Sequence, residues 1–414
     1  MSERLATDVF AFRDVQLRIT RRDVSGAGND DAEASGSGGE GGGDDDEEDE
    51  SFVDPHFFDE DYSVAATTGF CRVWEGAEVL TRLIEASVPR GASDAAGAPS
   101  GFDAGQTLNG GFPFALADAR VVELGAGVGL CGLAAASAGA HVMLTDLPAV
   151  VDEVLVRNIE ANRAKGATTT TEREDALSDA SDAIKTHSRA WLGAVAIVGG
   201  DGGDARPVGT ASAQPLDWTR DLDAQIEERR ARFESASERL AAEEAEEAAR
   251  SSRGATSSAA AAKEEEETLI EFWRRRAAPV DDPRVNCDLI LAAECVWLRE
   301  LVEPFCDTVV SLLRPNGSAK ACVLSFRDRS SFGKETETNV ALRDAEAAIV
   351  AAADDDPRET PFASFAHTGE GAFVPVADVI AAFERRGCRW ETLAKIPSAE
   401  DEGYHVHVFQ MYFL

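Results

Sequence analysis

The sequence is poor in positive charge. Its 414 residues include 76 Asp and Glu but only 40 Lys and Arg, which gives a formal net charge of −36. Binding to nucleic acid or to an anionic membrane depends on a basic surface, so the composition argues against both partners. The chain also lacks an apolar run near the roughly 18 to 20 residues that cross a bilayer, and residues 1–20 lack the apolar stretch of a signal peptide. We therefore expect a protein of the cytoplasm or, alternatively, the nucleus.

Cysteine is also scarce: there are seven, an odd number, scattered along the chain and mostly set in apolar stretches. This pattern indicates reduced, buried thiols rather than a disulfide framework or a zinc site. His405 and His407 lie two residues apart without further ligands nearby in the sequence, so we expect no metal site.

Two low-complexity segments divide the chain. Residues 23–61 hold sixteen acidic residues and neither Lys nor Arg, around a glycine-rich centre, which predicts a disordered loop. Residues 220–276 are rich in Glu, Ala and Arg and predict a helical insertion exposed to solvent. The acidic loop either keeps the protein soluble or attracts a basic protein partner. The remaining parts are an N-terminal β-hairpin over 1–22 and one α/β domain over 62–219 and 277–414.

Strand and helix patterns alternate through that domain. Strands are expected at 119–123, 141–145, 194–198, 287–292, 321–326, 389–395 and 405–413, and helices at 130–138, 149–163, 302–313 and 376–386. A loose loop is expected at 91–111. Such alternation predicts a parallel, doubly wound sheet with helices on both faces, here with a strand hairpin at its C-terminal end.

A glycine-rich turn follows the first of these strands, in the run from Glu123 through Gly125 and Gly127 to a helix. Glycines let the backbone turn sharply and approach a ligand, and a helix N-terminus presents free N–H groups. The acidic side chain of Glu123 would repel a pyrophosphate, but it suits the ammonium group of a methionine-derived ligand. Asp146 ends the next strand about 20 residues later, where a carboxylate commonly accepts hydrogen bonds from ribose hydroxyls. The alternative is that Asp146 only caps the next helix.

Six motifs occur together in one order. They are Trp74–Ala77, Glu123–Gly129, Thr145–Pro148, Leu216–Trp218, Asp288–Glu294 and Ser325–Arg329. In this order they resemble the seven-β-strand, S-adenosylmethionine-dependent protein lysine methyltransferases, methyltransferase family 16, which includes the relatives of methyltransferase-like protein 21. The resemblance implies a Rossmann-like class I methyltransferase fold with a seven-stranded sheet, S-adenosylmethionine as cofactor, and a lysine-bearing protein as substrate. A monomer is favoured.

The resemblance also implies roles for single residues. The cofactor-binding set is Trp74, Glu123, Gly125, Gly127, Asp146, Leu147, Asp217, Trp218, Ala292 and Ala293. Trp74 would lie near the methionine end of the cofactor, Asp146 at the ribose, and Asp217 with Trp218 at the adenine. The alternative for Trp74 and Trp218 is that they are large core residues.

Glu294 and Trp297 stand where the family usually has Asp-x-x-Tyr. The resemblance implies that Glu294 orients the incoming amine and that Trp297 helps to exclude water, as the pair of catalytic residues. An amine of ordinary pKa near 10.4 must lose its proton before it can attack, and burial favours that loss. Alternatively, Glu294 only caps a helix. Cys131 and Cys295 are expected to be packing residues rather than nucleophiles.

Two other functions stay open on the sequence. A methyltransferase of this fold could act on a different protein side chain or on a small molecule. From another class, the chain could be a non-catalytic adaptor that binds the cofactor and makes its contacts through the acidic insertions.

Overall fold

The computed structural model describes residues 5–13, 15–23, 70–88, 112–164, 191, 194–198, 209–252, 282–328 and 374–413. The predicted acidic loop after Asp23, the predicted loop at 91–111 and the second part of the helical insertion, 253–276, lie outside these residues. None of the helices that the structure describes is long and apolar enough to cross a membrane.

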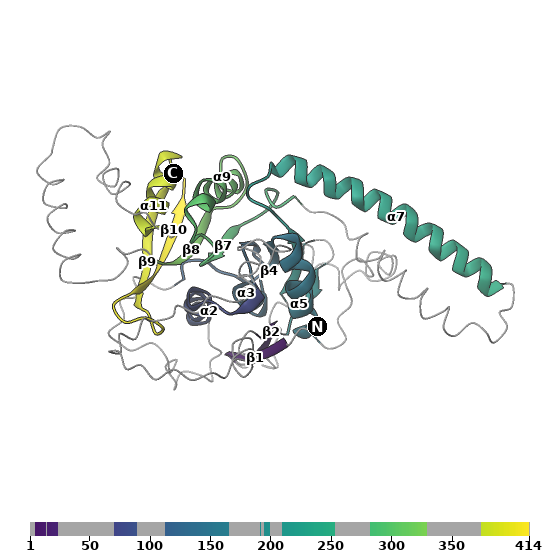
Figure 1. Ribbon diagram of the computed structural model, residues 1–414, viewed down its shortest axis with the longest axis horizontal. Helices are drawn as coiled ribbons and strands as arrows, with labels where there is room; N and C mark the ends of the chain where they lie inside the picture. Colours follow the sequence, from purple (N-terminus) through teal and green to yellow (C-terminus); the bar gives the residue numbers. More distant parts are fainter. Residues whose placement is uncertain are drawn as a thin grey trace, which may run out of the picture.

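A central sheet of mainly parallel strands organises the domain (Figure 1). Across the described residues its order is β5-β6-β4-β3-β7-β8-β10-β9. These strands are β3 (Arg120–Leu124), β4 (His141–Asp146), β5 (Val195–Ala196), β6 (Thr210–Pro215), β7 (Leu289–Ala293), β8 (Ala321–Arg327), β9 (Arg389–Pro397) and β10 (His405–Tyr412). β10 runs antiparallel to both of its neighbours, β8 and β9, as the predicted C-terminal hairpin requires. The mixed α/β fold is therefore confirmed, with the two-residue β5 added at one edge.

Nine helical segments connect or cover the strands. They are α2 (Glu75–Ser87), α3 (Leu130–Ser137), α4 (Pro148–Val150), the π-helical η1 (Val151–Leu155), α5 (Val156–Ala161), α7 (Leu222–Ser252), the 3-10 helix η3 (Arg299–Leu301), α9 (Val302–Leu312) and α11 (Val376–Arg385) among the described residues. The helix predicted at 149–163 is thus divided into α4, η1 and α5.

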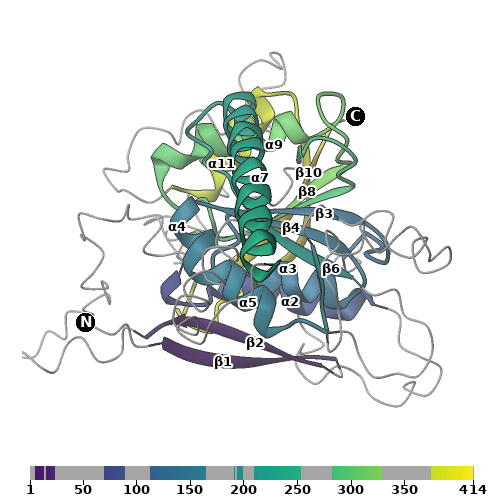
Figure 2. The ribbon, with the colours of Figure 1, turned by 90° about the vertical axis from the view of Figure 1, so that its right-hand side faces the viewer.

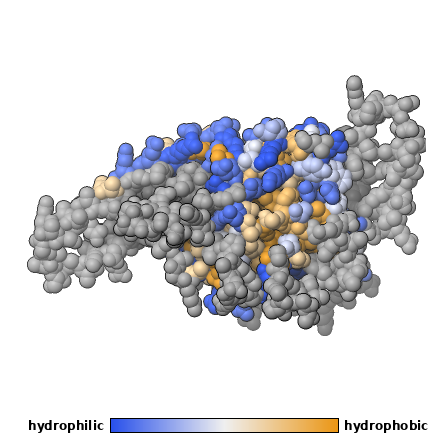
Figure 3. All heavy atoms as spheres, turned by 180° about the vertical axis from the view of Figure 1, so that it is seen from behind, coloured by the Kyte–Doolittle hydropathy of each residue, from blue (hydrophilic) through white to orange (hydrophobic). Residues whose placement is uncertain are grey.

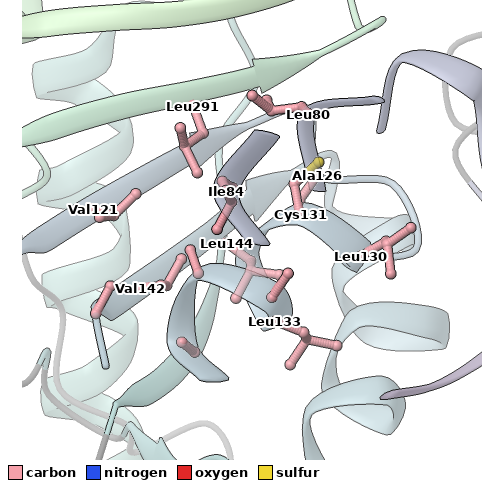
Figure 4. Close-up of a cluster of buried hydrophobic side chains, with 14 of the residues drawn as sticks. Leu80, Ile84, Val121, Ala126, Leu130, Cys131, Leu133, Val142, Leu144 and Leu291 are labelled. Carbon is pink, nitrogen blue, oxygen red and sulfur yellow. The ribbon is translucent and has the colours of Figure 1, made fainter. Parts of the chain in front are cut away.

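The helices cover both faces of the sheet (Figure 2). Alternate strand residues point to opposite faces, so Val121 packs under α2 and α3, whereas Val122 packs under α9 and α11. Figure 4 shows the first of these cores, where Leu80 and Ile84 of α2 meet side chains of α3 and of the strands. This packing fixes the helix N-termini relative to the strand ends.

Two elements differ from the sequence prediction. The third parallel strand is β6, not the segment at 194–198, which forms only the short antiparallel β5. β6 reads Thr-Ala-Ser-Ala-Gln-Pro and lacks the β-branched apolar run that marks a buried strand. Helix α2 was not predicted either, although Val79, Leu80, Leu83 and Ile84 have helical spacing and are buried.

The predicted N-terminal hairpin is confirmed as β1 (Leu5–Phe12) and β2 (Val15–Arg22), a separate two-stranded sheet. It lies beside the layer of α2, α3 and α5 in Figure 2. Asn158 of α5 and Asn162, the residue after this helix, pair with the backbone of β2. The side-chain amide of Asn158 bonds the N–H and C=O of Thr20, and that of Asn162 bonds those of Arg18, at 2.7–2.9 Å. Each amide thus makes, with one residue of β2, the two hydrogen bonds that a neighbouring strand would make.

Helix α7 projects from the body along most of its 31 residues (Figure 1). Its arm is largely hydrophilic on the face shown in Figure 3. At its base Ile226 is buried, and Arg284 of the domain pairs with Asp223 at 2.7 Å. The predicted helical insertion is confirmed over these residues.

Candidate functional site

A cavity of about 400 Å³ opens at the carboxyl ends of the parallel strands. The strand order reverses at β3, because the chain goes from β3 to β4 and β6 on one side and returns to β7 on the other. Open α/β sheets bind their ligands at such a point. The following predicted site residues line the cavity: Trp74, Glu123, Gly125, Gly127, Asp146, Leu147, Asp217, Trp218, Ala293, Glu294 and Trp297.

Ala292 is the predicted site residue that does not belong to this lining. It is fully buried and packs with the core under α9 and α11. The reason is strand alternation: adjacent residues of β7 point to opposite faces, and Ala293 takes the position toward the cavity.

The turn between β3 and α3 requires glycine for two reasons, its backbone conformation and its close packing. Gly125, Gly127 and Gly129 have φ of +62°, +53° and +85°. A Cβ on Gly125 would lie 2.5 Å from Cβ of Cys295 and 3.0 Å from the indole of Trp218. A side chain at Gly125 would therefore collide with Cys295 and Trp218 at this wall of the cavity.

Asp146 closes the turn by accepting two backbone hydrogen bonds. Its Oδ2 accepts from the N–H of Gly127 and its Oδ1 from the N–H of Leu147, both at 2.7 Å. Burial raises the pKa of this carboxyl group to about 6, although the two N–H donors act in the opposite direction. Asp146 therefore organises the glycine turn and also faces the cavity.

Glu123 is a second buried acid at the same wall. Its Oε2 accepts a 2.9 Å hydrogen bond from the N–H of Gly132 in α3. Burial, with a further contribution from the nearby Asp146, raises the pKa of Glu123 to about 8 against the opposing effect of that N–H. A cation bound beside it would favour the ionised form.

Trp218 and Asp217 lie in the loop after β6. The Trp218 ring packs edge-to-face on Phe305 of α9, with centroids 5.1 Å apart. Its indole N–H is buried and has no hydrogen-bond partner in the described protein, so a ligand acceptor could satisfy it. The carboxylate of Asp217, in contrast, already accepts hydrogen bonds from the N–H and hydroxyl of Thr219 at 2.9 and 2.7 Å.

Glu294 occupies a buried position at the end of β7, in a left-handed backbone conformation with φ of +49°. Its Oε2 accepts a 2.7 Å hydrogen bond from the N–H of Gly76, in the first turn of α2. Its Oε1 lies 4.0 Å from Nε of the buried Arg327. A carboxylate at a helix N-terminus is favourable, so Glu294 caps α2, a helix distant in sequence, rather than the one that follows it.

Arg327 connects this cap to the loop between β9 and β10. Its Nη1 lies 3.2 Å from a carboxylate oxygen of Glu75 and 2.9 Å from those of Glu400 and Asp401. Glu75 in turn accepts a 2.6 Å hydrogen bond from the hydroxyl of Ser398. These acidic groups thus meet at the buried guanidinium of Arg327, and Glu400 also pairs with Arg72 of the cavity lining at 2.8 Å.

Both cysteines near the cavity are poor nucleophiles. Burial raises the pKa of Cys131 and of Cys295 well above the ordinary value for a thiol. The protonated thiol of Cys131 donates to the carbonyl of Ala77 at 3.2 Å. Because the thiolate is the reactive form, this environment supports the packing role.

Several lining residues were not predicted from the sequence. They are Arg72, Ala77, Ala126, Val128, Leu130, Leu216, Thr219, Cys295, Leu298, Glu300 and Leu301. Most of these residues lie within a predicted motif or next to one. The sequence located the motif but not which of its residues face the cavity. The sequence offered only one indication for Arg72, its position two residues before Trp74. In the structure its guanidinium lies over the Trp74 ring, 4.4 Å from the centroid.

Within the described ranges, no group of three or more His, Cys, Asp or Glu side chains is placed to hold a metal ion. The polar groups at the cavity include a glycine turn, two buried acids of raised pKa and an indole N–H that has no partner in the described part of the chain. These groups fit a ligand that carries an ammonium, hydroxyls and a heterocyclic acceptor.

Comparison with known proteins points the same way. Residues 63–181 match the family described as lysine methyltransferase, Methyltransf_16. The matched segment includes Trp74, the glycine turn and Asp146, whereas Glu294 and Trp297 lie beyond it. No curated protein matches the chain.

Two solved structures show a distant likeness. One is magnesium protoporphyrin IX methyltransferase from Synechocystis PCC 6803 with bound SAH, at 11% identity and a TM-score of 0.27, over 72% of this chain and 75% of that one. The other comes from work described as "Conversion of a Disulfide Bond into a Thioacetal Group during Echinomycin Biosynthesis". It has 10% identity and a TM-score of 0.26, over 72% of this chain and 76% of that one.

The family match implies S-adenosylmethionine as the cofactor. Residues 63–181 are thus similar to a family described as lysine methyltransferase, which confirms the resemblance stated from the sequence.

Proposed function

We propose that this protein is an S-adenosylmethionine-dependent methyltransferase that modifies lysine side chains of a protein. The observation that carries the proposal is the convergence of Glu123, the glycine turn and Asp146 in one cavity, inside the segment that matches the family. Bound S-adenosylmethionine supplies a methyl group activated by a sulfonium. The protein has to hold this group in line with an unprotonated amine.

Each wall of the cavity then has a task. Ionised Glu123 would pair with the ammonium of the cofactor, and Asp146 would accept hydrogen bonds from ribose hydroxyls. The indole N–H of Trp218 is available to donate to the adenine ring. These roles would give partners to two buried acids and to an indole N–H for which the described protein supplies no acceptor, and a buried polar group without a partner is costly.

The acceptor amine would enter near Glu294 and Trp297, which line the same cavity. A lysine is protonated at neutral pH, and transfer from water into this partly apolar space lowers its pKa. The carboxylate of Glu294, fixed by Gly76, would then accept an N–H of the amine and orient its lone pair. Trp297 would shield the reacting groups from water.

One observation favours a second candidate, a cofactor-binding adaptor without turnover. Glu294 already accepts a hydrogen bond from Gly76 and lies within an ion-pair distance of Arg327. A carboxylate held in this way serves the fold even without a substrate. In that case the cavity binds the cofactor, and the acidic insertions make the functional contacts.

Transfer of label distinguishes the two candidates. The purified chain is incubated with a cell lysate and S-adenosylmethionine tritiated in its methyl group, and the labelled proteins are hydrolysed. Labelled methyl-lysine is the expected result. Label in another amino acid would replace lysine as the acceptor, label in a small molecule would replace the protein substrate, and cofactor binding without any transfer would favour the adaptor.

A further inference from the structure

The first two turns of helix α7 contact the loop that forms one wall of the cavity. That loop follows β6 and contains Asp217 and Trp218. The helix starts at Leu222, only four residues after Trp218. Two of the side chains at its base, Gln225 and Arg229, bond the backbone of the segment from Pro215 to Asp217.

Gln225 holds the loop by both ends of its amide. Its Oε1 accepts a 2.9 Å hydrogen bond from the N–H of Asp217, and its Nε2 donates to the C=O of Asp217, also at 2.9 Å. The same Nε2 lies 3.1 Å from the C=O of Arg220. Gln225 is only 6% exposed, so water does not readily replace these bonds.

Arg229 holds the preceding residues, one turn further along α7. Its Nη1 donates to the C=O of Pro215 at 2.7 Å and to Oε1 of Gln214 at 3.0 Å. Its Nε donates to the C=O of Gln225 at 3.2 Å. Arg229 therefore connects the end of β6 to the residue that holds Asp217.

The fixed loop in turn sets the position of the Trp218 indole. The ring lies against Phe305 on one side and approaches Gly125 so closely that a Cβ there would lie 3.0 Å from it. A shift of the loop would therefore change the width of the cavity at the glycine turn. It would also move the indole N–H, which has no partner among the described residues.

We propose that Gln225 and Arg229 are positioning residues of the cofactor site, which hold residues 214–218 so that Trp218 faces the glycine turn. Neither residue lines the cavity, so they act through the loop. The inference rests on the proposed function, since it assigns the cavity to S-adenosylmethionine. It follows that the base of the helical insertion belongs to the catalytic domain, whereas its arm does not.

Three methionine variants of the full chain test this proposal. Gln225→Met and Arg229→Met remove the contacts while keeping a long side chain that suits a helix. Arg230→Met is the matched control: Arg230 is the next residue of α7, and its guanidinium pairs with Glu227 on the exposed surface. Binding of S-adenosylhomocysteine is measured by calorimetry, and KM and kcat are measured for the cofactor if the chain turns over.

We expect each of the first two variants to bind S-adenosylhomocysteine roughly tenfold more weakly than the original chain, as loss of a buried hydrogen-bonded restraint implies. KM for the cofactor should rise while kcat at saturation stays within about twofold, and Arg230→Met should match the original chain. Arg229→Lys, which keeps one donor near Pro215, should recover part of the affinity. A purely structural role would lower the melting temperature of the variants and leave the affinity unchanged.

The outcomes distinguish a failure of the positioning role from a failure of the proposed function. If the original chain binds S-adenosylhomocysteine and both methionine variants bind it equally well, the positioning role is wrong and the proposed function stands. If the original chain does not bind it, the proposed function fails. Should the methionine variants not fold, Arg229→Lys decides: unchanged affinity in that variant would overturn the role of Arg229.

Discussion

The carboxylate of Glu294 and the backbone N–H of Gly76 are joined by a 2.7 Å hydrogen bond, although the two residues lie 218 positions apart in the chain. The bond connects the end of β7 to the first turn of α2, next to the cavity. It gives Glu294 a structural task in addition to its predicted catalytic one. Variants can separate these two tasks.

Glu294→Gln keeps the structural task and removes the charge. The amide oxygen of Gln can still accept the hydrogen bond from Gly76, so the fold and cofactor affinity should change little. An uncharged amide orients an amine less well, and we expect kcat to fall by about 10²-fold or more. Calorimetry with S-adenosylhomocysteine and a labelled-transfer assay provide the two readouts. Unchanged kcat would remove Glu294 from the chemistry and leave it as a cap.

Gly76→Ala tests the packing on the other side of the same bond. A Cβ at this position would lie 2.4 Å from Cγ of Glu294 and 2.9 Å from Oγ of Ser325. Such overpacking typically costs about 1–3 kcal/mol of unfolding free energy. Urea unfolding measures the change, with Ala77→Ser, the next residue of α2, as a comparison. A Gly76→Ala variant of undiminished stability would mean that Glu294 can leave its position.

Cofactor affinity should depend on pH through Glu123. In the free protein the pKa of Glu123 is about 8, so the acid is mostly protonated at neutral pH. The ammonium of the ligand favours the ionised form, and binding must therefore release a proton. Affinity should rise as the pH increases from 6.5, and the rise should level off toward pH 7.5 as the α-amino group of the ligand, with an ordinary pKa of about 7.7–8.0, begins to lose its own proton.

Calorimetry of S-adenosylhomocysteine binding across this range tests the prediction, and buffers of different ionisation enthalpy reveal the released proton. The control is Glu123→Gln, which should bind more weakly and with a flatter pH dependence. Asp146 has a pKa of about 6 and is already largely ionised above pH 7, so the upper half of the range reports mainly Glu123. The same pH slope in Glu123→Gln would contradict the assignment of the ammonium to this residue.

The N-terminal hairpin should depend on Asn158. Its amide bonds both polar groups of Thr20 and also donates to the C=O of Val128 at 2.8 Å. Asn158→Ala would leave the part-buried N–H and C=O of Thr20 and the buried C=O of Val128 without these partners, and we expect a loss of about 2–4 kcal/mol in unfolding free energy. Arg157→Ala, on the exposed side of the same helix, should change stability by less than about 0.5 kcal/mol. Equal stability of the two variants would show that the hairpin is held by its apolar face alone.

Patterns of local residues account for what the sequence predicted well. The strands around the glycine turn are apolar runs, and the turn itself contains glycines whose positive φ angles require them. The hairpin likewise shows strict alternation, with Leu17 and Ile19 buried. Such signals depend on neighbouring residues only, so they are visible without the fold.

What the sequence did not predict depends on distant contacts. β6 is made of small and polar residues, and it is a strand because the adjacent β4 supplies its hydrogen bonds. The contact of Glu294 with Gly76 and the hold of Gln225 on Asp217 likewise arise from the arrangement of whole elements. Ala292 and Ala293 were both predicted at the site, but neighbouring residues of a strand point to opposite faces, and only Ala293 lines the cavity.

The central claim is that the cavity at β3 and β4 binds S-adenosylmethionine. Calorimetric titration of the full chain with S-adenosylmethionine, and separately with S-adenosylhomocysteine, tests it most directly, with Asp146→Ala as the paired variant. We predict micromolar binding of both ligands to the original chain and at least tenfold weaker binding to the variant. Absence of binding to the original chain, or equal binding to Asp146→Ala, would contradict the account.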